Sequence, residues 1–482
     1  FFVTSGKWYW EGVGSGYVGA IIGSGGEGYT GSISVTGSKS IGWWELGPVY
    51  WDGGNNAGST SYSTSDVIGV ALDMDAGNVK FYKNGSLTYT ITFGSGTVPD
   101  LSSGVFAGYN VGLSTKSVDL NFGQRAFTYA APSGYKCLCT ANLDDPTIAD
   151  GSTGMDSVVY SGNSSTQTIS GLNFSPDLVW IKSRSQTRDH KLVDSVRGVG
   201  EELEPNQTTA EVTNSDGLTA FNSDGFSIGD DFDYNVGGGN TYVAWAWDAG
   251  SSTVSNTDGT ITSQVRANPS SGFSIVSYTG TSANATLGHG LNAAPEMIII
   301  KNRDRDFAWF VYHESIGPTK NLKLNESSAA TTVSSYFNNT APTSSVFSVG
   351  AAVGTNYTGE DIIAYCFAPV EGYSAFGSYT GNGSADGPFV YTGFQPRWIM
   401  IKSTASTNSW VVHDTARDPH NAATRQLLTN DSAAELDTAL TSRDFLSNGF
   451  KLRNTNASIN TSSVKYIYAA FAEHPFKTSR AN

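Results

Sequence analysis

Three acidic side chains recur behind a buried-looking lysine, and they are the first candidates for acid–base chemistry. Each acid follows its lysine by 12 or 13 positions. The acids are Asp194, Glu314 and Asp414, and the lysines are Lys182, Lys301 and Lys402. Two of the acids have a histidine directly before them, His313 and His413. These are residue types that a hydrolase uses as a proton donor and acceptor around one substrate bond.

The spacing argues against catalysis at these positions. Neighbouring residues on a strand point to opposite faces, so a histidine and the acid beside it do not reach the same substrate atom. An active site rarely needs three copies, whereas a framework contact recurs in every copy. We therefore predict that the acids pair with the lysines, or with Arg197 and Arg417 at the next turn, and that none of these residues is catalytic.

Metal and cofactor sites find little support. The six histidines are scattered without the spacing of a zinc site, and no glycine-rich loop ends in a phosphate-binding lysine. The segment 73–78 resembles a calcium loop but lacks its closing glutamate and flanking helices, so it predicts a hairpin turn. The aspartates around Asp231 predict a solvated acidic surface, with a divalent-cation site as the alternative. We expect neither a metal nor a cofactor.

Three tryptophans are the candidates for ligand binding. Trp43, Trp44 and Trp51 lie in glycine-flanked sequence that reads as loops. An exposed aromatic ring stacks on the apolar face of a sugar while neighbouring amides bind its hydroxyl groups. We predict a glycan-binding surface here. The alternative is that at least one of these rings belongs to the core.

A repeated strand positions the lysines. Proline, one polar residue, four large apolar residues and lysine occur at 176–182, 295–301 and 396–402. Such a short apolar run predicts a central strand that is buried on both faces. Each copy follows a tyrosine-containing turn and precedes an asparagine and a closing strand. The asparagines are Asn206, Asn325 and Asn430, and the closing strands are 242–247, 362–367 and 466–471.

Repeats of this length are whole domains, so the chain is expected to be all-β. Its 55 glycines, 12% aromatic and 15% charged residues among 482 fit tightly turned sheets. The predicted order is a jelly-roll sandwich at 1–130, a linker at 131–157 and three homologous β-sandwiches at 158–250, 272–370 and 371–478. The segment 253–268 is predicted to join the first two sandwiches, and 433–441 is the one predicted helix.

The charge distribution and the number of cysteines limit which classes of partner and which cellular compartment fit the chain. The net charge is −15, and residues 131–260 alone carry 6 basic against 18 acidic side chains. This balance excludes a nucleic-acid backbone as ligand, and no apolar run approaches the roughly 20 residues of a membrane span. Three cysteines make no disulfide framework, which fits assembly in a reducing cytosol. Cys137 and Cys139 are predicted to be badly placed to bridge each other. The missing initiator Met suggests an absent N-terminal segment.

The first 125 residues or so resemble the SPRY family. The motifs that carry the resemblance are Gly6-Lys7-Trp8-Tyr9-Trp10-Glu11, Ile68-Gly69-Val70-Ala71-Leu72-Asp73, Val79-Lys80-Phe81-Tyr82-Lys83-Asn84-Gly85 and Asn121-Phe122-Gly123-Gln124-Arg125. The resemblance implies a two-sheet sandwich of the concanavalin A-like lectin type. It also implies binding through loops at one end, and no catalysis.

The repeats, over roughly 131–478, resemble the tandem β domains of marine and cyanobacterial phage virion proteins. The likeness is carried by residues 170–182, by 364–367 with 371–374, and by 450–452 with 472–477. It implies a tail-fibre or surface appendage that binds host glycans, contacts other virion proteins and is commonly homotrimeric. We expect it to be assembled in the host cytoplasm, without membrane insertion. Capsid decoration is the alternative, and a polysaccharide depolymerase the third reading.

Overall fold

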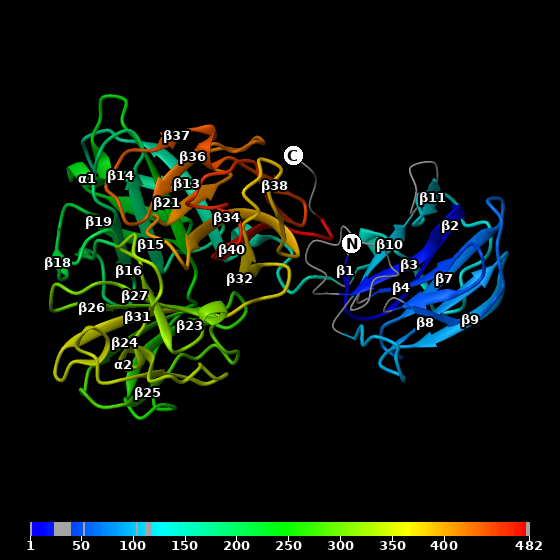
Figure 1. Ribbon diagram of the computed structural model, residues 1–482. Helices are drawn as coiled ribbons and strands as arrows, with labels where there is room; N and C mark the ends of the chain where they lie inside the picture. The colour runs from blue at the N-terminus through cyan, green and yellow to red at the C-terminus, as the bar shows by residue number, and fades with distance from the viewer. Residues whose placement is uncertain are drawn as a thin grey trace. The chain divides into compact units, whose positions relative to one another are not determined.

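The structure of the protein is a computed structural model that describes residues 2–23, 40–51, 54–102, 105–110, 117–143 and 145–478. The chain forms two compact units, Phe1–Asp144 and Asp145–Asn482 (Figure 1). Both units are built almost entirely from antiparallel strands, which confirms the predicted all-β class.

The first unit is a sandwich of two sheets. One sheet has the order β1 (Phe2–Val3), β10 (Val105–Asn110), β3 (Tyr17–Gly23), β4 (Ser40–Trp44), β5 (Val49–Trp51) and β6 (Gly54–Ala57). The other has the order β11 (Val118–Asn121), β2 (Lys7–Gly14), β7 (Val67–Asp73), β8 (Asn78–Lys83) and β9 (Ser86–Thr92), with β12 (Lys136–Cys137) parallel to β2. Large side chains including Trp10, Trp43 and Phe81 fill the core.

Strands β7, β8 and β9 form two hairpins, the first of which was predicted. Strands β7 and β8 pair from Ile68↔Lys83 to Asp73↔Asn78, so the suspected calcium loop is their turn. The Asp73 carboxylate accepts the Ala76 N–H at 2.9 Å inside that turn. Asn84 (φ 49°) and Gly85 (φ 79°) connect β8 to β9 in the left-handed conformation that a two-residue hairpin needs.

The second unit contains one sheet pair three times. The first repeat has β13 (Met155–Ser161), β21 (Thr241–Trp247), β15 (Leu178–Ser183) and β16 (Lys191–Asp194) in one sheet, and β14 (Gln167–Ser170), β20 (Gly225–Ile228) and β19 (Leu218–Asn222) in the other. The second repeat has β24 (Phe273–Thr279), β31 (Asp361–Phe367), β26 (Met297–Asn302), β27 (Phe310–His313), β28 (Lys320–Lys323) and β29 (Thr331–Thr332), facing β25 (Ala285–Gly288) and β30 (Val346–Val349).

The third repeat follows the same order. Its larger sheet is β32 (Ser374–Thr380), β40 (Lys465–Pro475), β34 (Phe394–Ser403), β35 (Val411–Asp414), β36 (Arg425–Leu428) and β37 (Leu436–Asp437). Its smaller sheet is β33 (Phe389–Tyr391), β39 (Gly449–Leu452) and β38 (Arg443–Leu446). The three predicted apolar runs are thus the equivalent central strands β15, β26 and β34. In β15 and β26 every side chain is buried.

The three repeats meet around one shared core. Their closing strands β21, β31 and β40 bring the equivalent side chains Trp247, Phe367 and Phe471 together. The ring centroids lie 6.3 Å apart for Trp247 and Phe367, 5.8 Å for Trp247 and Phe471, and 5.9 Å for Phe367 and Phe471. The surrounding cluster takes apolar residues from every repeat. In Figure 1 the repeats can be followed by colour from teal through yellow-green to red.

Several connecting segments differ from their predicted form. The segment at 253–268 forms a hairpin, β22 (Thr253–Asn256) and β23 (Ser263–Asn268), which extends the sheet of the second repeat. The helix predicted at 433–441 is wrong, because Leu436–Asp437 pair as β37 and only Ala439–Thr441 turn as the 3-10 helix η4. Strand β13 begins at Met155, inside the predicted linker.

The remaining elements are short. They are α1 (Phe232–Asn235), α2 (Ser334–Phe337), α3 (Val353–Asn356), the 3-10 helices η1 (Thr140–Asn142), η2 (Gly151–Thr153) and η3 (Glu314–Ile316), and the strand pair β17 (Glu201–Glu202) and β18 (Val212–Thr213). Within the described residues, no helix has the length and apolar character needed to cross a membrane.

Candidate functional site: the contacts between the repeats

The three repeated lysines are completely buried and bind backbone carbonyl groups. Lys182 donates to Ser183 O at 2.8 Å. Lys301 donates to Thr208 O of the first repeat at 2.9 Å, and Lys402 donates to Ser327 O of the second at 3.0 Å. Burial lowers the pKa of each lysine to about 8. Two of the three lysines therefore tie one repeat to another, and the predicted pairing with the repeated acids is wrong.

The strand register corrects one of the predicted acids. Leu178 pairs with Asp194, Met297 with His313, and Trp398 with Asp414. The counterpart of the two aspartates in the second repeat is thus His313. Glu314 lies one residue further on, is exposed, and begins η3. The spacing from the lysine to the acid is one residue longer in the second repeat, so the sequence pointed to Glu314 and not to His313, which is the true counterpart of the aspartates.

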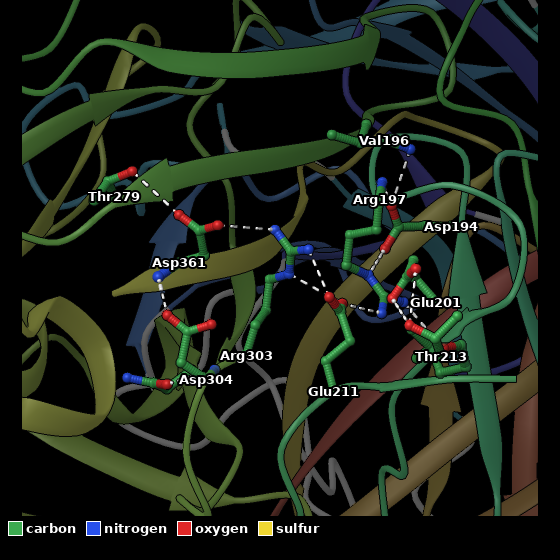
Figure 2. A network of polar contacts seen from close by, with 12 residues as sticks. Asp194, Val196, Arg197, Glu201, Glu211, Thr213, Thr279, Arg303, Asp304 and Asp361 are labelled. Atoms are coloured by element: carbon green, nitrogen blue, oxygen red, sulfur yellow. Dashed lines mark hydrogen bonds and ion pairs between the residues drawn. The ribbon is translucent and has the colours of Figure 1, made fainter. Parts of the chain in front are cut away.

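Asp194 is the centre of a buried polar chain between the first and second repeats (Figure 2). Its carboxylate accepts Arg197 Nε at 2.5 Å and the hydroxyl of Tyr365 from the second repeat at 2.8 Å. Arg197 continues to Glu211 at 2.8 Å. Glu211 also binds Arg303 of the second repeat, at 2.6 Å. This chain of polar contacts thus joins the two repeats at both ends, through Tyr365 at one end and Arg303 at the other.

The same chain recurs between the third and first repeats. Asp414 accepts Arg417 Nε at 2.6 Å and Trp245 Nε1 of the first repeat at 2.9 Å. Arg417 binds Glu435 at 2.9 Å, and Glu435 binds Arg184 of the first repeat at 2.8 Å. Arg417 and Asp414 have fully buried side chains. The prediction that the acids could pair with Arg197 and Arg417 is confirmed.

The contact between the second and third repeats lacks this chain. Its equivalent positions hold residues without the required groups, namely His313, Ile316, Ala330, Thr404 and Ala469. The backbone bond beside the chain is kept, from Ala330 N to Thr404 O at 3.0 Å. It matches Glu211 N to Arg303 O at 2.7 Å and Glu435 N to Arg184 O at 2.8 Å.

His313 makes a neutral substitute at this third contact. Its Nε2 lies 3.1 Å from Tyr468 O of the third repeat, and its Nδ1 accepts the Ser315 N–H at 3.2 Å. These partners assign the proton to Nε2. Burial lowers the pKa of His313 to about 4, so the ring is uncharged at neutral pH. Glu296 lies nearby, and burial together with the charge of Glu314 raises its pKa to about 7.

The repeated asparagines explain a second contact that is present at all three junctions. Asn206, Asn325 and Asn430 each accept a backbone N–H at 2.9 Å, from His190, Trp309 and Trp410 respectively. The rings of those three residues then bind carbonyl groups of a neighbouring repeat. The bonds are His190 Nε2 with Leu428 O at 3.0 Å, Trp309 Nε1 with Glu204 O at 3.0 Å and Trp410 Nε1 with Lys323 O at 2.9 Å.

Two carboxylates of the Asp-rich loop, those of Asp231 and Asp233, bind groups within the protein. Asp231 accepts the Asp233 N–H at 2.7 Å and caps α1. Asp233 lies 3.3 Å from Lys191, and burial raises the pKa of Asp233. Among the described residues no group of three or more His, Cys, Asp or Glu side chains is placed to hold a metal ion.

The three candidate tryptophans separate onto the two faces of their sheet. Trp43 and Trp51 lie on strands β4 and β5 and belong to the core, with 0% and 7% exposure. This corrects the expectation that they sit on loops as a ligand surface. Trp44 points the other way and is half-buried with Tyr50 beside Tyr17. Its ring centroid lies 4.6 Å from that of Tyr17, and Leu46 in the following turn is 72% exposed.

The cysteines are free thiols. Cys366 is fully buried in the core of the second repeat, and burial raises its pKa. The Sγ atoms of Cys137 and Cys139 lie 3.3 Å apart. The prediction that these two are badly placed for one another is therefore wrong, because a turn follows the two-residue strand β12 and brings both thiols to Asn142.

Comparisons with known proteins agree with this division of the chain. A family model described as a domain of unknown function (DUF7483) matches residues 150–475, and the SPRY domain model matches residues 7–125. No curated protein matches the chain.

Two solved structures show weak likeness. The SPRY domain of human HERC1 has 19% identity over 26% of this chain and 80% of that chain, with a TM-score of 0.18. The NanB sialidase from Streptococcus pneumoniae has 10% identity over 95% of this chain and 78% of that chain, with a TM-score of 0.16. At these TM-scores neither likeness bears on function.

Removal of the Tyr365 hydroxyl tests the buried chain at Asp194. We expect Tyr365→Phe to lower the free energy of unfolding by about 1–3 kcal/mol, since the buried carboxylate loses a donor that water does not replace. Tyr336→Phe is the control, because the half-buried Tyr336 packs its ring against Phe310, with 4.1 Å between the ring centroids, and its hydroxyl has no hydrogen-bond partner among the described residues. Urea unfolding measures both. Equal effects of the two substitutions would show that the hydroxyl contributes nothing to the contact.

Acid should weaken the contact at His313. The folded pKa is depressed to about 4, so between pH 6.5 and 4 the unfolded chain takes up a proton that the folded chain does not, and stability falls as pH falls. Wild type should lose up to about 1.4 kcal/mol per pH unit more than His313→Gln over this window. Urea unfolding at pH 7 and pH 5 measures the difference. Identical slopes would refute a buried neutral His313.

Proposed function

The chain belongs to the family described as a domain of unknown function (DUF7483), and we propose that it is a non-enzymatic structural protein of a bacteriophage virion. In this proposal, residues 145–478 form a rigid support and the SPRY domain recognises the host. The protein would act on the particle as a tail fibre or other surface appendage. Its partners would be other virion proteins and a glycan of the host surface, and its copies would assemble as a homotrimer.

The observation that carries the proposal is the use of the repeated polar residues. Asp194, Arg197 and Glu211 form contacts within and between repeats. Asp414, Arg417 and Glu435 form the equivalent contacts. These are the side chains with the best types for acid–base chemistry, and the first two members of each chain are closed off from solvent. In a structural support, buried charged groups hold parts of the protein together. In an active site, such groups must be accessible to the substrate.

Interlocking of the repeats also suits an appendage. Aromatic contacts across each junction, together with ion pairs across two of them, resist the local opening that proteases exploit. Such a support would hold a binding module on the particle without moving itself. The charge-poor composition of the chain, 15% Asp, Glu, Lys and Arg, is in keeping with this role.

The surface proposed for the glycan is the aromatic cluster of Tyr17, Trp44 and Tyr50, on the face of the β3–β4–β5 sheet opposite to the core residue Trp43. The ring centroids of Tyr17 and Tyr50 lie 5.6 Å apart. Trp44 and Tyr50 keep part of their surface open, and Leu46 extends the apolar surface at the turn. A half-open aromatic surface of this kind is suited to the apolar face of a sugar ring.

Loss of binding on Trp44→Ala tests the recognition role. We expect binding of the full chain to host cells, or to a host glycan array, to fall at least tenfold, because one stacking surface is removed. Leu87→Ser is the matched control, since Leu87 is 55% exposed on β9 of the other sheet and should leave binding unchanged.

Unchanged binding of Trp44→Ala would contradict the proposed surface. Localisation of the chain in a map of the assembled particle separates the tail from the capsid, where a decorating role would place it. Release of reducing sugar from host polysaccharide by the intact chain would replace the proposal with a depolymerase.

A further inference from the structure

The third repeat buries an arginine where the first repeat buries a leucine. In the first repeat Leu218 on β19 pairs with Ile228, and in the third Arg443 on β38 pairs with Leu452. Both positions lie between the two sheets of their own sandwich. Leu218 is 1% exposed and Arg443 is 0% exposed. The internal repeat thus gives a direct comparison of the same site with and without a charge.

Most donors of Arg443 have no acceptor. Its Nη2 donates to Thr441 O at 3.3 Å. Its Nε and Nη1 are buried and have no hydrogen-bond partner in the part of the chain that the structure describes. No described carboxylate forms an ion pair with it, in contrast to Arg417, which is bound by Asp414 and Glu435. Burial lowers the pKa of Arg443 to about 9.

A histidine accompanies this arginine. His413 is 0% exposed and occupies the position of Val193 in the first repeat and Tyr312 in the second. Neither of its ring nitrogens has a partner among the described residues. Burial, followed by the charges of Arg443 and Arg417, holds the pKa of His413 well below its usual value. The ring is therefore neutral and has one N–H to donate.

No described group near Arg443 compensates its charge. The titratable residues that act on it electrostatically are Tyr379 and Arg417. The Tyr379 hydroxyl donates to Ile459 O at 2.7 Å, and burial holds its pKa well above the usual value, so it carries no charge. A buried arginine without a carboxylate or a full set of acceptors is strongly unfavourable. The leucine at this position in the first repeat shows that the fold itself has no need of the arginine.

From this cluster we propose that the third repeat contains a binding site for one small anion between its two sheets. Arg443 Nε and Nη1 and the N–H of His413 are its donors, and Arg443 supplies the charge. Since all of these groups are closed off from solvent, the fitting ligand is a monovalent anion of halide or formate size. The first repeat, with Leu218 and Val193, has no such site.

The test measures thermal unfolding of the full chain against anion concentration. At constant pH and ionic strength, the unfolding midpoint of the wild type should rise saturably with sodium chloride, bromide or formate, because a ligand that binds only the folded state stabilises it. Arg443→Leu should lose this response, because it places in the third repeat the residue type found at the same position of the first. Arg453→Leu is the control and should keep it, since Arg453 is a 43% exposed partner of Asp444.

Equal anion responses of the wild type and Arg443→Leu would overturn the proposal. His413→Val provides a second variant and should weaken the response at least tenfold in anion concentration. Crystals grown in bromide or formate give a readout that needs no variant. Density for either anion within hydrogen-bond distance of Arg443 Nε is expected and also separates the halide from the carboxylate. Absence of both anions from this position would refute the site.

Discussion

Burial of the central strands on both faces is the constraint on which the repeat unit depends. On β15, Val179 and Ile181 face the core of their own sandwich, whereas Leu178 and Trp180 face the shared core. On β26, Ile298 and Ile300 face inward and Met297 and Ile299 face the shared core. A repeat in isolation would expose its second apolar face to water, which is costly at about 25 cal/mol per Å². The three repeats cover these faces for one another.

Polar contacts then fix how the repeats meet. Apolar packing alone is non-directional, but a buried carboxylate that requires a partner from the next repeat admits few arrangements. Asp194 takes Tyr365, and Asp414 takes Trp245, from closing strands of neighbouring repeats. The third junction relies on His313 and a carbonyl oxygen instead. Two junctions therefore contain a buried carboxylate–arginine pair and the third does not, and this asymmetry distinguishes three otherwise equivalent repeats.

Much of this fold could be predicted from local pattern. The apolar run ending at Lys182 indicated a strand buried on both faces, and the segment 73–78 indicated a hairpin turn. What the pattern did not show is which atoms cover the second face, because that depends on contacts between residues more than 100 positions apart, such as Trp247 with Phe367. Lys301 and Lys402 point across the same junctions, so their partners were hidden for the same reason.

Other misjudgements came from register and face. His313 and Glu314 are neighbours on the chain, and only the pairing of Met297 with His313 shows which one replaces the aspartates. Trp43 and Trp44 are also neighbours on the chain. Because side chains alternate along β4, the Trp43 ring lies in the core and the Trp44 ring lies on the outer face of the sheet. Glycine-rich flanks had suggested a loop and so concealed the alternation. The unpartnered Arg443 had no sequence signal except the contrast with Leu218.

Hydrogen exchange of the intact chain tests most directly whether the three repeats are one cooperative body. If each central strand is covered by the other repeats, the most protected amides of β15, β26 and β34 should open with the same free energy, equal to that of global unfolding of residues 145–482. Three distinct opening free energies, one for each repeat, would contradict the shared core as the basis of the structure.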